Sequence, residues 1–324
     1  MRTRRRFLAL SAGAAMLCCA HRTAFAQGYP ARPVHIVVPF PPGGGTDILA
    51  RVIGQWLAER LGRPFVVENR PGASANIGTH AVIRAPSDGY TLLLAASVNA
   101  VNATLYEKLP FDFVRDIAPV AAMIRLPNVM VVPQGFPARD IPEFIAHAKA
   151  HPGKVNFASA GTGTAQHLAG ELFKMMAGID MAHIPYKGTA PALQDLLAGQ
   201  VQVLFANPAS SMKYVKSGKL RVLGVTSAQR IASLPGVPGI SEFLPGFEAT
   251  LFYGLGAPRN TPPEIIATLN GEINAGLAEP GIRSQLADLD GIVLGGSPAD
   301  FAKIIEDEIA KWGEVIRRAN IRVE

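Results

Sequence analysis

Apolar runs and amphipathic segments alternate along most of the chain. A mostly apolar run at Val34–Val38 is followed by apolar residues at helical spacing over Ile48–Leu61. The pattern then predicts a strand at Phe65–Glu68, a helix at Asn76–Arg84 and a strand at Thr91–Ala95. Strands that are apolar throughout are typical of a parallel sheet covered on both faces. This half of the chain therefore predicts a βαβαβ unit with right-handed crossovers.

A second alternating set follows an extended apolar segment at Ile117–Val132. We predict helices at Ile141–Ala150, Ala165–Ala177 and Ala190–Ala198, and strands at Val155–Ser159, Ala182–Pro185, Val201–Phe205 and Leu220–Thr226. A further apolar segment at Phe247–Ala257 precedes helices at Pro262–Leu277 and Phe301–Ala319. The two extended segments predict two chain crossings between two α/β lobes, and therefore a cleft between the lobes. The predicted fold class is α/β.

Residues 1–26 are typical of an export signal rather than of a folded element. Arginines at positions 2, 4, 5 and 6 precede a short apolar stretch, and Ala24-Phe25-Ala26 is an A-x-A cleavage site. The run Thr3-Arg4-Arg5-Arg6-Phe7-Leu8 also fits a twin-arginine signal, so the Sec and twin-arginine routes both stay open. We expect a periplasmic protein.

The charge balance changes once this segment is set aside. The whole chain has 31 Lys plus Arg against 25 Asp plus Glu, and five of the arginines lie in residues 1–26. The remaining 26 basic and 25 acidic residues nearly cancel, which argues against a nucleic-acid-binding protein. Cys18 and Cys19, the two cysteines of the chain, also lie in the signal. The mature chain therefore offers no disulfide, thiol nucleophile or cysteine metal site.

The most informative motif is Pro39-Phe40-Pro41-Pro42-Gly43-Gly44-Gly45-Thr46-Asp47, between a predicted strand and a predicted helix. Glycines let the backbone approach a ligand closely, and the first amides of a helix have no partner within the helix. The positive end of the helix dipole adds to their attraction for an anion. The motif therefore predicts a carboxylate or phosphate site. Asp47 is either a partner for a ligand amine or, as we favour, a structural group at the helix N-terminus.

The second half repeats this arrangement. Ser159-Ala160-Gly161-Thr162-Gly163-Thr164 separates a predicted strand from a predicted helix. Two anion-accepting loops, one in each lobe, suggest a dicarboxylate or an amino acid held from both sides. No Walker lysine follows either loop, and no Gly-x-Ser-x-Gly motif surrounds Ser159, so neither a nucleotide site nor a hydrolase is indicated. The seven histidines show no metal-like spacing, and His167 is expected to be structural. Lys187 either faces an anion or is a solvated turn residue.

Several long motifs occur in the order found in one family. They are the glycine loop with Asp47-Ile48-Leu49-Ala50-Arg51, then Val67-Glu68-Asn69-Arg70-Pro71-Gly72-Ala73, Ser87-Asp88-Gly89-Tyr90-Thr91-Leu92, the block from Ala158 to Glu171, and His183-Ile184-Pro185-Tyr186-Lys187-Gly188. The mature chain as a whole resembles the Bug-type solute receptors of tripartite tricarboxylate transporters. The resemblance implies a type II periplasmic-binding-protein-like fold, in which two α/β lobes close on a carboxylate.

Residue by residue, the resemblance implies a ligand site built from small and polar groups. The implied ligand-binding residues are Phe40, Pro41, Gly44, Thr46, Asp47, Ser97, Asn99, Ser159, Gly161, Thr162, Gly163, Thr164, Tyr186 and Asn207. Family members often carry an acidic residue after the strand that here ends in Phe205-Ala206-Asn207. Its replacement by Asn207 argues against an amino-acid ligand and favours a plain carboxylic acid, including an aromatic one.

The resemblance also implies a receptor rather than an enzyme, with no cofactor and no metal. Its partners would be a small organic carboxylate and the permease subunits of a membrane transporter, and we expect a monomer. The predicted domains are the signal at 1–26, lobe 1 at 27–125 and 250–324, and lobe 2 at 126–249. A ligand-sensing partner of a signalling receptor and, less favoured, a periplasmic enzyme stay open as alternatives.

Overall fold

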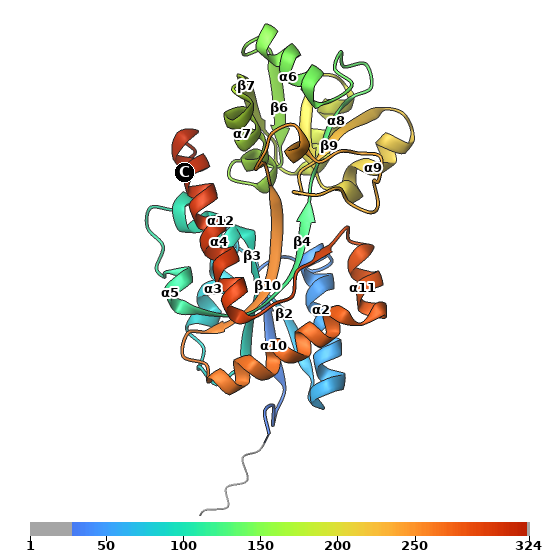
Figure 1. The fold of residues 1–324 in the computed structure, drawn as a ribbon. Helices are drawn as coiled ribbons and strands as arrows, with labels where there is room; N and C mark the ends of the chain where they lie inside the picture. The colour runs from blue at the N-terminus through green and yellow to red at the C-terminus, as the bar shows by residue number, and fades with distance from the viewer. Residues whose placement is uncertain (1–27, 323–324) are drawn as a thin grey trace, which may run out of the picture.

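The computed structural model describes residues 28–322, so the predicted signal at 1–26 lies outside the described residues. Two sheets, each with helices packed against it, form two lobes that are joined at a waist (Figure 1). The sheet of lobe 1 has the strand order β11-β4-β10-β3-β1-β2, and that of lobe 2 has the order β7-β6-β8-β5-β9. The predicted fold class, α/β with two lobes, is confirmed.

Lobe 1 begins with the predicted βαβαβ unit. Its elements are β1 (Val34–Val38), α2 (Gly45–Leu61), β2 (Phe65–Asn69), α3 (Asn76–Ile83) and β3 (Thr91–Ala96). β1 pairs in parallel with both β2 and β3, so the carboxyl ends of all three strands point the same way. The first helix starts at Gly45 rather than at Ile48, because the glycine residue itself adopts helical geometry after the N-cap Gly44.

The other strands of this sheet run against the first three. β10 (Thr250–Pro258) pairs antiparallel with β3 and with β4 (Ile117–Pro127), and the short β11 (Ile292–Val293) pairs antiparallel with β4. The expectation of a purely parallel sheet therefore holds only for the βαβαβ unit. The reason is topological: β10 returns from the other lobe and enters the sheet in the opposite direction.

Lobe 2 repeats this plan. Its strands are β5 (Val129–Pro133), β6 (Val155–Ser159), β7 (Met181–Pro185), β8 (Val203–Ala206) and β9 (Leu220–Val225). Its helices are α6 (Ile141–Ala150), α7 (Ala165–Ala177), α8 (Thr189–Leu197) and α9 (Pro208–Lys216). β6 pairs in parallel with β7 and β8, whereas β5 pairs antiparallel with β8 and β9.

The two crossings lie side by side at the waist. β4 ends at Pro127 and β5 begins at Val129, so Asn128 alone separates the two sheets. The Asn128 amide donates to Thr226 Oγ1 over 2.7 Å, and the Thr226 amide donates back to the Asn128 carbonyl over 2.9 Å. The Ala249 amide, just before β10, donates to the Thr226 carbonyl. These bonds tie the outgoing and returning segments together at the waist. The exact lobe boundaries of 27–125, 126–249 and 250–324 stay a prediction.

Helices outside the βαβ units complete the fold. They are α4 (Ser97–Leu105), α5 (Phe113–Asp116), α10 (Pro263–Ala278), α11 (Pro280–Ala287), α12 (Pro298–Arg318) and the short 3₁₀ turn η1 (Ile240–Glu242). The long C-terminal helix α12 runs beside the waist from one lobe to the other (Figure 1). Phe301 and Ile305 pack in a cluster of lobe 1, whereas Trp312 and Ile316 join the aromatic core of lobe 2. The sequence predicted this apolar face but not that it spans both lobes.

Candidate functional site

The glycine loop after β1 leads into the N-terminus of α2. The N-cap Gly44 makes no side-chain cap bond, so the first amides of α2 have no partner within the helix or from the cap side chain. Pro41 and Gly44 are exposed, Phe40 is half-buried against the lobe 1 core, and Thr46 is buried. The loop therefore leads into a helix N-terminus with backbone donors of the kind that favours anions, and the anion site that the motif predicts stays a prediction.

Asp47 is held inside this loop by four hydrogen bonds. Arg51 donates to both carboxylate oxygens, and the Gly43 amide and Asn69 Nδ2 each donate once, all over 3.0 Å. The pKa of Asp47 is lowered to about 2, mainly by the hydrogen bonds from Arg51. Burial acts in the opposite direction, and the hydrogen bond from the Gly43 amide lowers the pKa further. Both carboxylate oxygens of Asp47 accept hydrogen bonds from the protein itself, so Asp47 stabilises the loop. This is the structural role that the sequence favoured.

Ser97 and Asn99 follow β3 directly. They lie in the first turn of α4, a helix that the sequence analysis did not predict, and both are buried. Ser97 Oγ accepts a hydrogen bond from the Phe252 amide in β10 over 2.6 Å. The Asn99 side chain accepts from the Ala96 amide and donates to Thr79 Oγ1. Their side chains therefore hold α4 against lobe 1, and α4 adds a further helix N-terminus at the carboxyl end of a strand.

The second glycine loop folds tightly onto its own backbone. Thr164 is the N-cap of α7, and its hydroxyl donates to the Gly161 carbonyl over 2.7 Å. Gly161 and Gly163 have φ angles of 139° and 76°, a region that a side chain rarely adopts. A Cβ on Gly163 would lie 2.7 Å from a Leu105 methyl group in α4. The loop of lobe 2 therefore lies directly against lobe 1, and Thr162 at its tip is exposed.

Two stacked histidines lie beneath this loop. The rings of His167 and His183 are 3.7 Å apart and nearly parallel. The Gly163 amide donates to His167 Nδ1 over 3.0 Å, and His183 Nε2 lies 2.7 Å from Ser159 Oγ, which also bonds the backbone of Gly161. Because the Gly163 amide already carries a proton, His167 Nδ1 accepts in its neutral form. The pair therefore supports the loop that was predicted to bind the ligand.

This pair predicts a loss of stability in mild acid. The pKa of His183 is lowered to about 4, mainly by burial and then by the charge of Lys174. The pKa of His167 is lowered to about 3, mainly by burial and then by the charges of His183 and Lys174. Glu171 Oε1 lies 3.8 Å from His167 Nε2, and within residues 28–322 no other carboxylate forms an ion pair with His167. In the unfolded chain both rings take up a proton near pH 6.5. The stability that they contribute is complete above pH 6.5 and falls as the pH drops toward 4.

The expected result is a free energy of unfolding that decreases between pH 7 and pH 5. His183→Gln, which keeps a group able to bond Ser159, should show a smaller decrease than the wild type over the same range. Urea unfolding at the two pH values measures both. An equal pH dependence in the two proteins would contradict the assignment.

The remaining predicted residues mark two more helix N-termini. The Tyr186 hydroxyl donates to Asp195 over 2.7 Å, and burial together with this bond raises the pKa of Tyr186 to about 12. Tyr186 lies just before α8. Asn207 is the N-cap of α9 and accepts from the Ala209 amide over 2.9 Å. Asn207 is thereby used as a cap, a role that the sequence did not predict.

Together these elements give the site its character. Five helices each begin after a strand of one of the two sheets: α2 and α4 in lobe 1, and α7, α8 and α9 in lobe 2. In open α/β sheets ligands bind at the carboxyl ends of the strands, and helix N-termini favour anions there. Arg51 is engaged by Asp47, whereas Lys187, beside α8, is exposed. The site can therefore hold a negative charge mainly with backbone donors.

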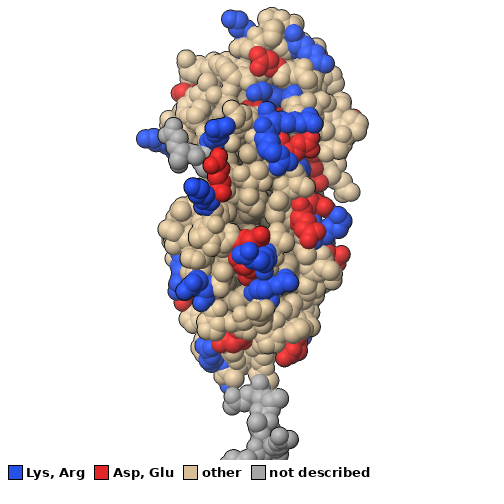
Figure 2. All heavy atoms as spheres, turned by 90° about the vertical axis from the view of Figure 1, so that its left-hand side faces the viewer, with Lys and Arg blue, Asp and Glu red and all other residues tan. Residues whose placement is uncertain are grey.

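Three of the predicted residues line one cavity. Ser97, Gly163 and Thr164 face a space of about 70 Å³ between α4, α7, β10 and α12. Val98, Val101, Leu251 and Trp312, which the sequence did not single out, complete much of its wall. Space-filling atoms show the two lobes meeting at a narrowed, hollowed waist (Figure 2). The predicted residues of the first glycine loop do not line this cavity.

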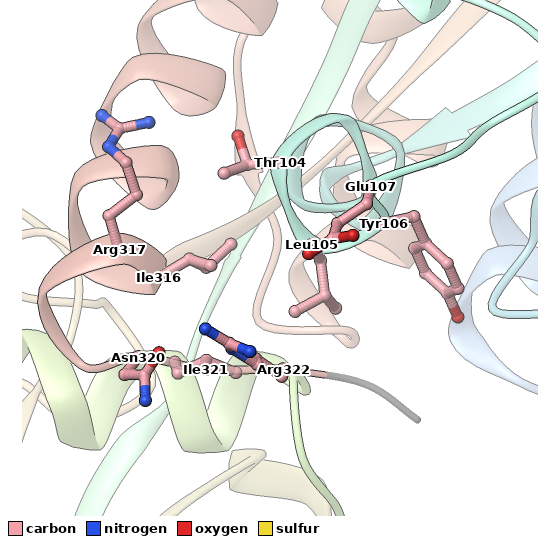
Figure 3. Close-up of a pocket in the computed structure, with 9 residues that line it drawn as sticks. All are labelled: Thr104, Leu105, Tyr106, Glu107, Ile316, Arg317, Asn320, Ile321 and Arg322. Atoms are coloured by element: carbon pink, nitrogen blue, oxygen red, sulfur yellow. The ribbon is translucent and has the colours of Figure 1, made fainter.

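A larger hollow lies elsewhere. A groove of about 520 Å³ separates the C-terminal ends of α4 and α12, and Figure 3 shows Tyr106, Glu107, Arg317 and Arg322 along it. None of the predicted ligand-binding residues lines this groove. Among residues 28–322, no group of three or more His, Asp, Glu or Cys could hold a metal ion. A search of the same residues for a helix long and apolar enough to cross a membrane found none.

Known proteins resemble this chain both in sequence and in fold. Residues 49–321 match the model of the tripartite tricarboxylate transporter family receptor. Protein BugT of Bordetella pertussis is 37% identical over 302 residues, which are 92% of this chain and 93% of BugT.

Two solved structures are similar over most of the chain. The structure of R. palustris Rpa4515 with adipate is 36% identical, with a TM-score of 0.77, and the match covers 91% of this chain and 99% of that one. MatC (Rpa3494) from Rhodopseudomonas palustris with bound malate is 32% identical, with a TM-score of 0.72, covering 89% and 100%. The resemblance to Bug-type receptors is thereby confirmed, and the chain belongs to the receptor family of the tripartite tricarboxylate transporters.

Proposed function

We propose that this protein is an extracytoplasmic receptor that captures a small organic carboxylate by closure of its two lobes and delivers it to the permease subunits of a membrane transporter. The observation that carries the proposal is the pair of glycine loops, one in each lobe, each leading into a helix N-terminus. A carboxylate between the lobes would accept hydrogen bonds from both. The relatives bound to adipate and malate support a carboxylate as the ligand class.

Closure follows from the architecture. The lobes are joined by two crossings, one at Asn128 and one just before Thr250, and each glycine loop belongs to a different lobe. A ligand that contacts both loops binds the closed arrangement more tightly than the open one, and shifts the population by that difference in affinity. We expect the predicted residues Phe40, Pro41, Gly44, Thr46, Thr162 and Tyr186 to lie nearest the ligand.

One contact could instead suggest an enzyme, because Ser159 and His183 form a close hydroxyl–imidazole pair. A nucleophile must reach its substrate. Ser159 is completely buried, and its hydroxyl also bonds the carbonyl and the amide of Gly161. The pair is therefore a structural support of the loop, and we favour a receptor without turnover. A sensing role, with a signalling receptor in place of the permease, would use the same two loops.

Native mass spectrometry of residues 27–324 purified from the periplasm, followed by thermal unfolding with a panel of acids, tests the proposal. Mono-, di- and tricarboxylates, amino acids and aromatic acids are compared with their neutral amides as matched controls. A ligand at 100 times its Kd adds about 2.7 kcal/mol of stability, and the amide should add little because it carries no negative charge. Stabilisation by no acid at millimolar concentration would contradict a carboxylate receptor.

A further inference from the structure

The cavity between α4, α7, β10 and α12 has a wall made mainly of carbon. Its apolar lining comes from Val98, Val101, Ala165, Leu168, Leu251 and the ring of Trp312. These residues belong to both lobes: α4 and β10 are part of lobe 1, α7 is part of lobe 2, and α12 spans the two. The complete cavity therefore exists only while the lobes hold this arrangement.

The polar residues around it are already engaged elsewhere. Ser97 Oγ accepts from the Phe252 amide, and Thr164 Oγ1 donates to the Gly161 carbonyl. Thr250 Oγ1 bonds Arg125 and Glu248, each within 3.1 Å. Trp312 Nε1 donates to Glu308 over 2.6 Å, so it is also occupied. Each of these hydroxyl and indole groups already has at least one partner, so much of the hydrogen-bonding capacity around the cavity is taken. An apolar guest, by contrast, would bury its surface against the carbon lining.

The size of the cavity limits this guest. Its volume is about 70 Å³, whereas an apolar cavity that holds benzene measures about 150 Å³ and one water occupies about 30 Å³ of liquid. The space therefore suits a group of two or three carbon atoms and not an aromatic ring. Ser97 and Thr164 place the cavity beside the first turns of α4 and α7. The N-terminus of α7 is one of the two helix N-termini at which the carboxylate would be held.

We propose that this cavity takes a short aliphatic group of the bound carboxylate, so that the receptor prefers acids with an aliphatic end of two or three carbons. The proposal rests on the proposed function, since the carboxylate is held by the helix N-termini. Because the wall combines both lobes, filling the cavity would favour the lobe arrangement in which that wall is complete. The aliphatic end would then add both affinity and selectivity.

Titration calorimetry with the straight-chain acids from acetate to hexanoate tests the proposal, with succinate as an acid that lacks an apolar end. Each methylene group buried in the cavity is worth about 0.8 kcal/mol, which corresponds to about a fourfold gain in affinity. Affinity should rise over the first two or three added carbons and then stop rising. The mature wild-type chain is used, so that both lobes and α12 are present.

Two substitutions at one half-buried wall residue test the location. Val98→Phe should fill the cavity and remove the rise with chain length, while the affinity for acetate and succinate changes less than about twofold. Val98→Ala should enlarge the cavity, so that affinity continues to increase with chain length for one more carbon. Val66→Phe, the same substitution at an exposed residue of β2, is the matched control and should leave the series unchanged.

The outcomes separate the two proposals. The aliphatic preference is overturned if succinate binds and the alkanoates either bind without dependence on chain length or do not bind at all. Both results leave the receptor function intact. Equal losses for every acid in Val98→Phe also overturn it, because they indicate a structural effect. Failure of all carboxylates to bind the wild type overturns the proposed function itself.

Discussion

Gly170→Ala is expected to destabilise the protein by about 1–3 kcal/mol, although alanine is the better helix former. Gly170 lies within α7 and faces β6, and a Cβ there would lie 2.3 Å from Cε2 of Phe157. Phe157 is fully buried in the lobe 2 core and stacks with His167 and His183, so it cannot move aside without disturbing that core. Overpacking of a close-packed core costs more than the gain in helix propensity.

The identical substitution at Gly271 provides the control. Gly271 is an exposed residue within α10, and a Cβ there would meet nothing within 4 Å. Gly271→Ala should therefore stabilise the protein by about 0.5–1 kcal/mol. Urea unfolding of both variants measures the difference. Two stabilised variants would mean that α7 does not pack on β6 as closely as described here.

Asp47→Ala is expected to have the largest effect on the site. It removes the acceptor that holds Gly43, Asn69 and Arg51, so the first glycine loop loses its support. We expect a loss of about 2 kcal/mol in unfolding free energy, typical of hydrogen bonds to a charged group, and at least a tenfold weaker carboxylate affinity. Asp307→Ala is the control, since Asp307 forms an exposed pair with Lys303 and such pairs contribute about 0.5 kcal/mol or less.

The pH dependence of this difference gives a second readout. The pKa of Asp47 is lowered to about 2 from an ordinary value of 3.8. Its contribution to stability is therefore complete above pH 3.8 and is lost as the pH falls through 2. The gap in stability between wild type and Asp47→Ala should be full at pH 7 and much smaller near pH 2. A gap that does not change with pH would show that the carboxylate charge is not what stabilises the loop.

The local parts of this fold could be predicted because their signals are local. The run Val34–Val38 and the glycines after it place β1, the loop and α2 without reference to any distant residue. The second loop follows the same pattern, so the sequence predicted both glycine loops and the helices that follow them. The two crossings were also predictable, because the long apolar segments around Asn128 and Thr250 had no helical period.

The missed features depend on contacts between distant residues. Helix α4 has the sequence Ser-Val-Asn-Ala-Val-Asn-Ala-Thr-Leu, whose β-branched and asparagine residues are weak helix formers. It is fixed instead by Ser97 accepting from Phe252, 155 residues along the chain. The cavity beside it combines four elements from both lobes, and no spacing in the sequence indicates that Val98 and Trp312 line the same space.

The stacked histidines His167 and His183 also show that contacts between distant residues could not be predicted from the sequence. His167 was predicted to be structural because no catalytic partner was evident nearby in sequence. That interpretation agrees with its bond to the Gly163 amide, yet the stacking on His183 depends on the pairing of β6 with β7. The sequence could therefore indicate the role of His167 but not the partner that holds it.

The most direct test of the central claim is a distance measured between the lobes with and without a carboxylate. Because the mature chain has no cysteine, Gln55→Cys in α2 and Gln194→Cys in α8 place one spin label on an exposed residue of each lobe. Pulsed electron paramagnetic resonance should show the distance distribution shorten and narrow when a stabilising acid is added, and not when its neutral amide is added. A distribution that the acid leaves unchanged at saturation would contradict capture by closure of the two lobes.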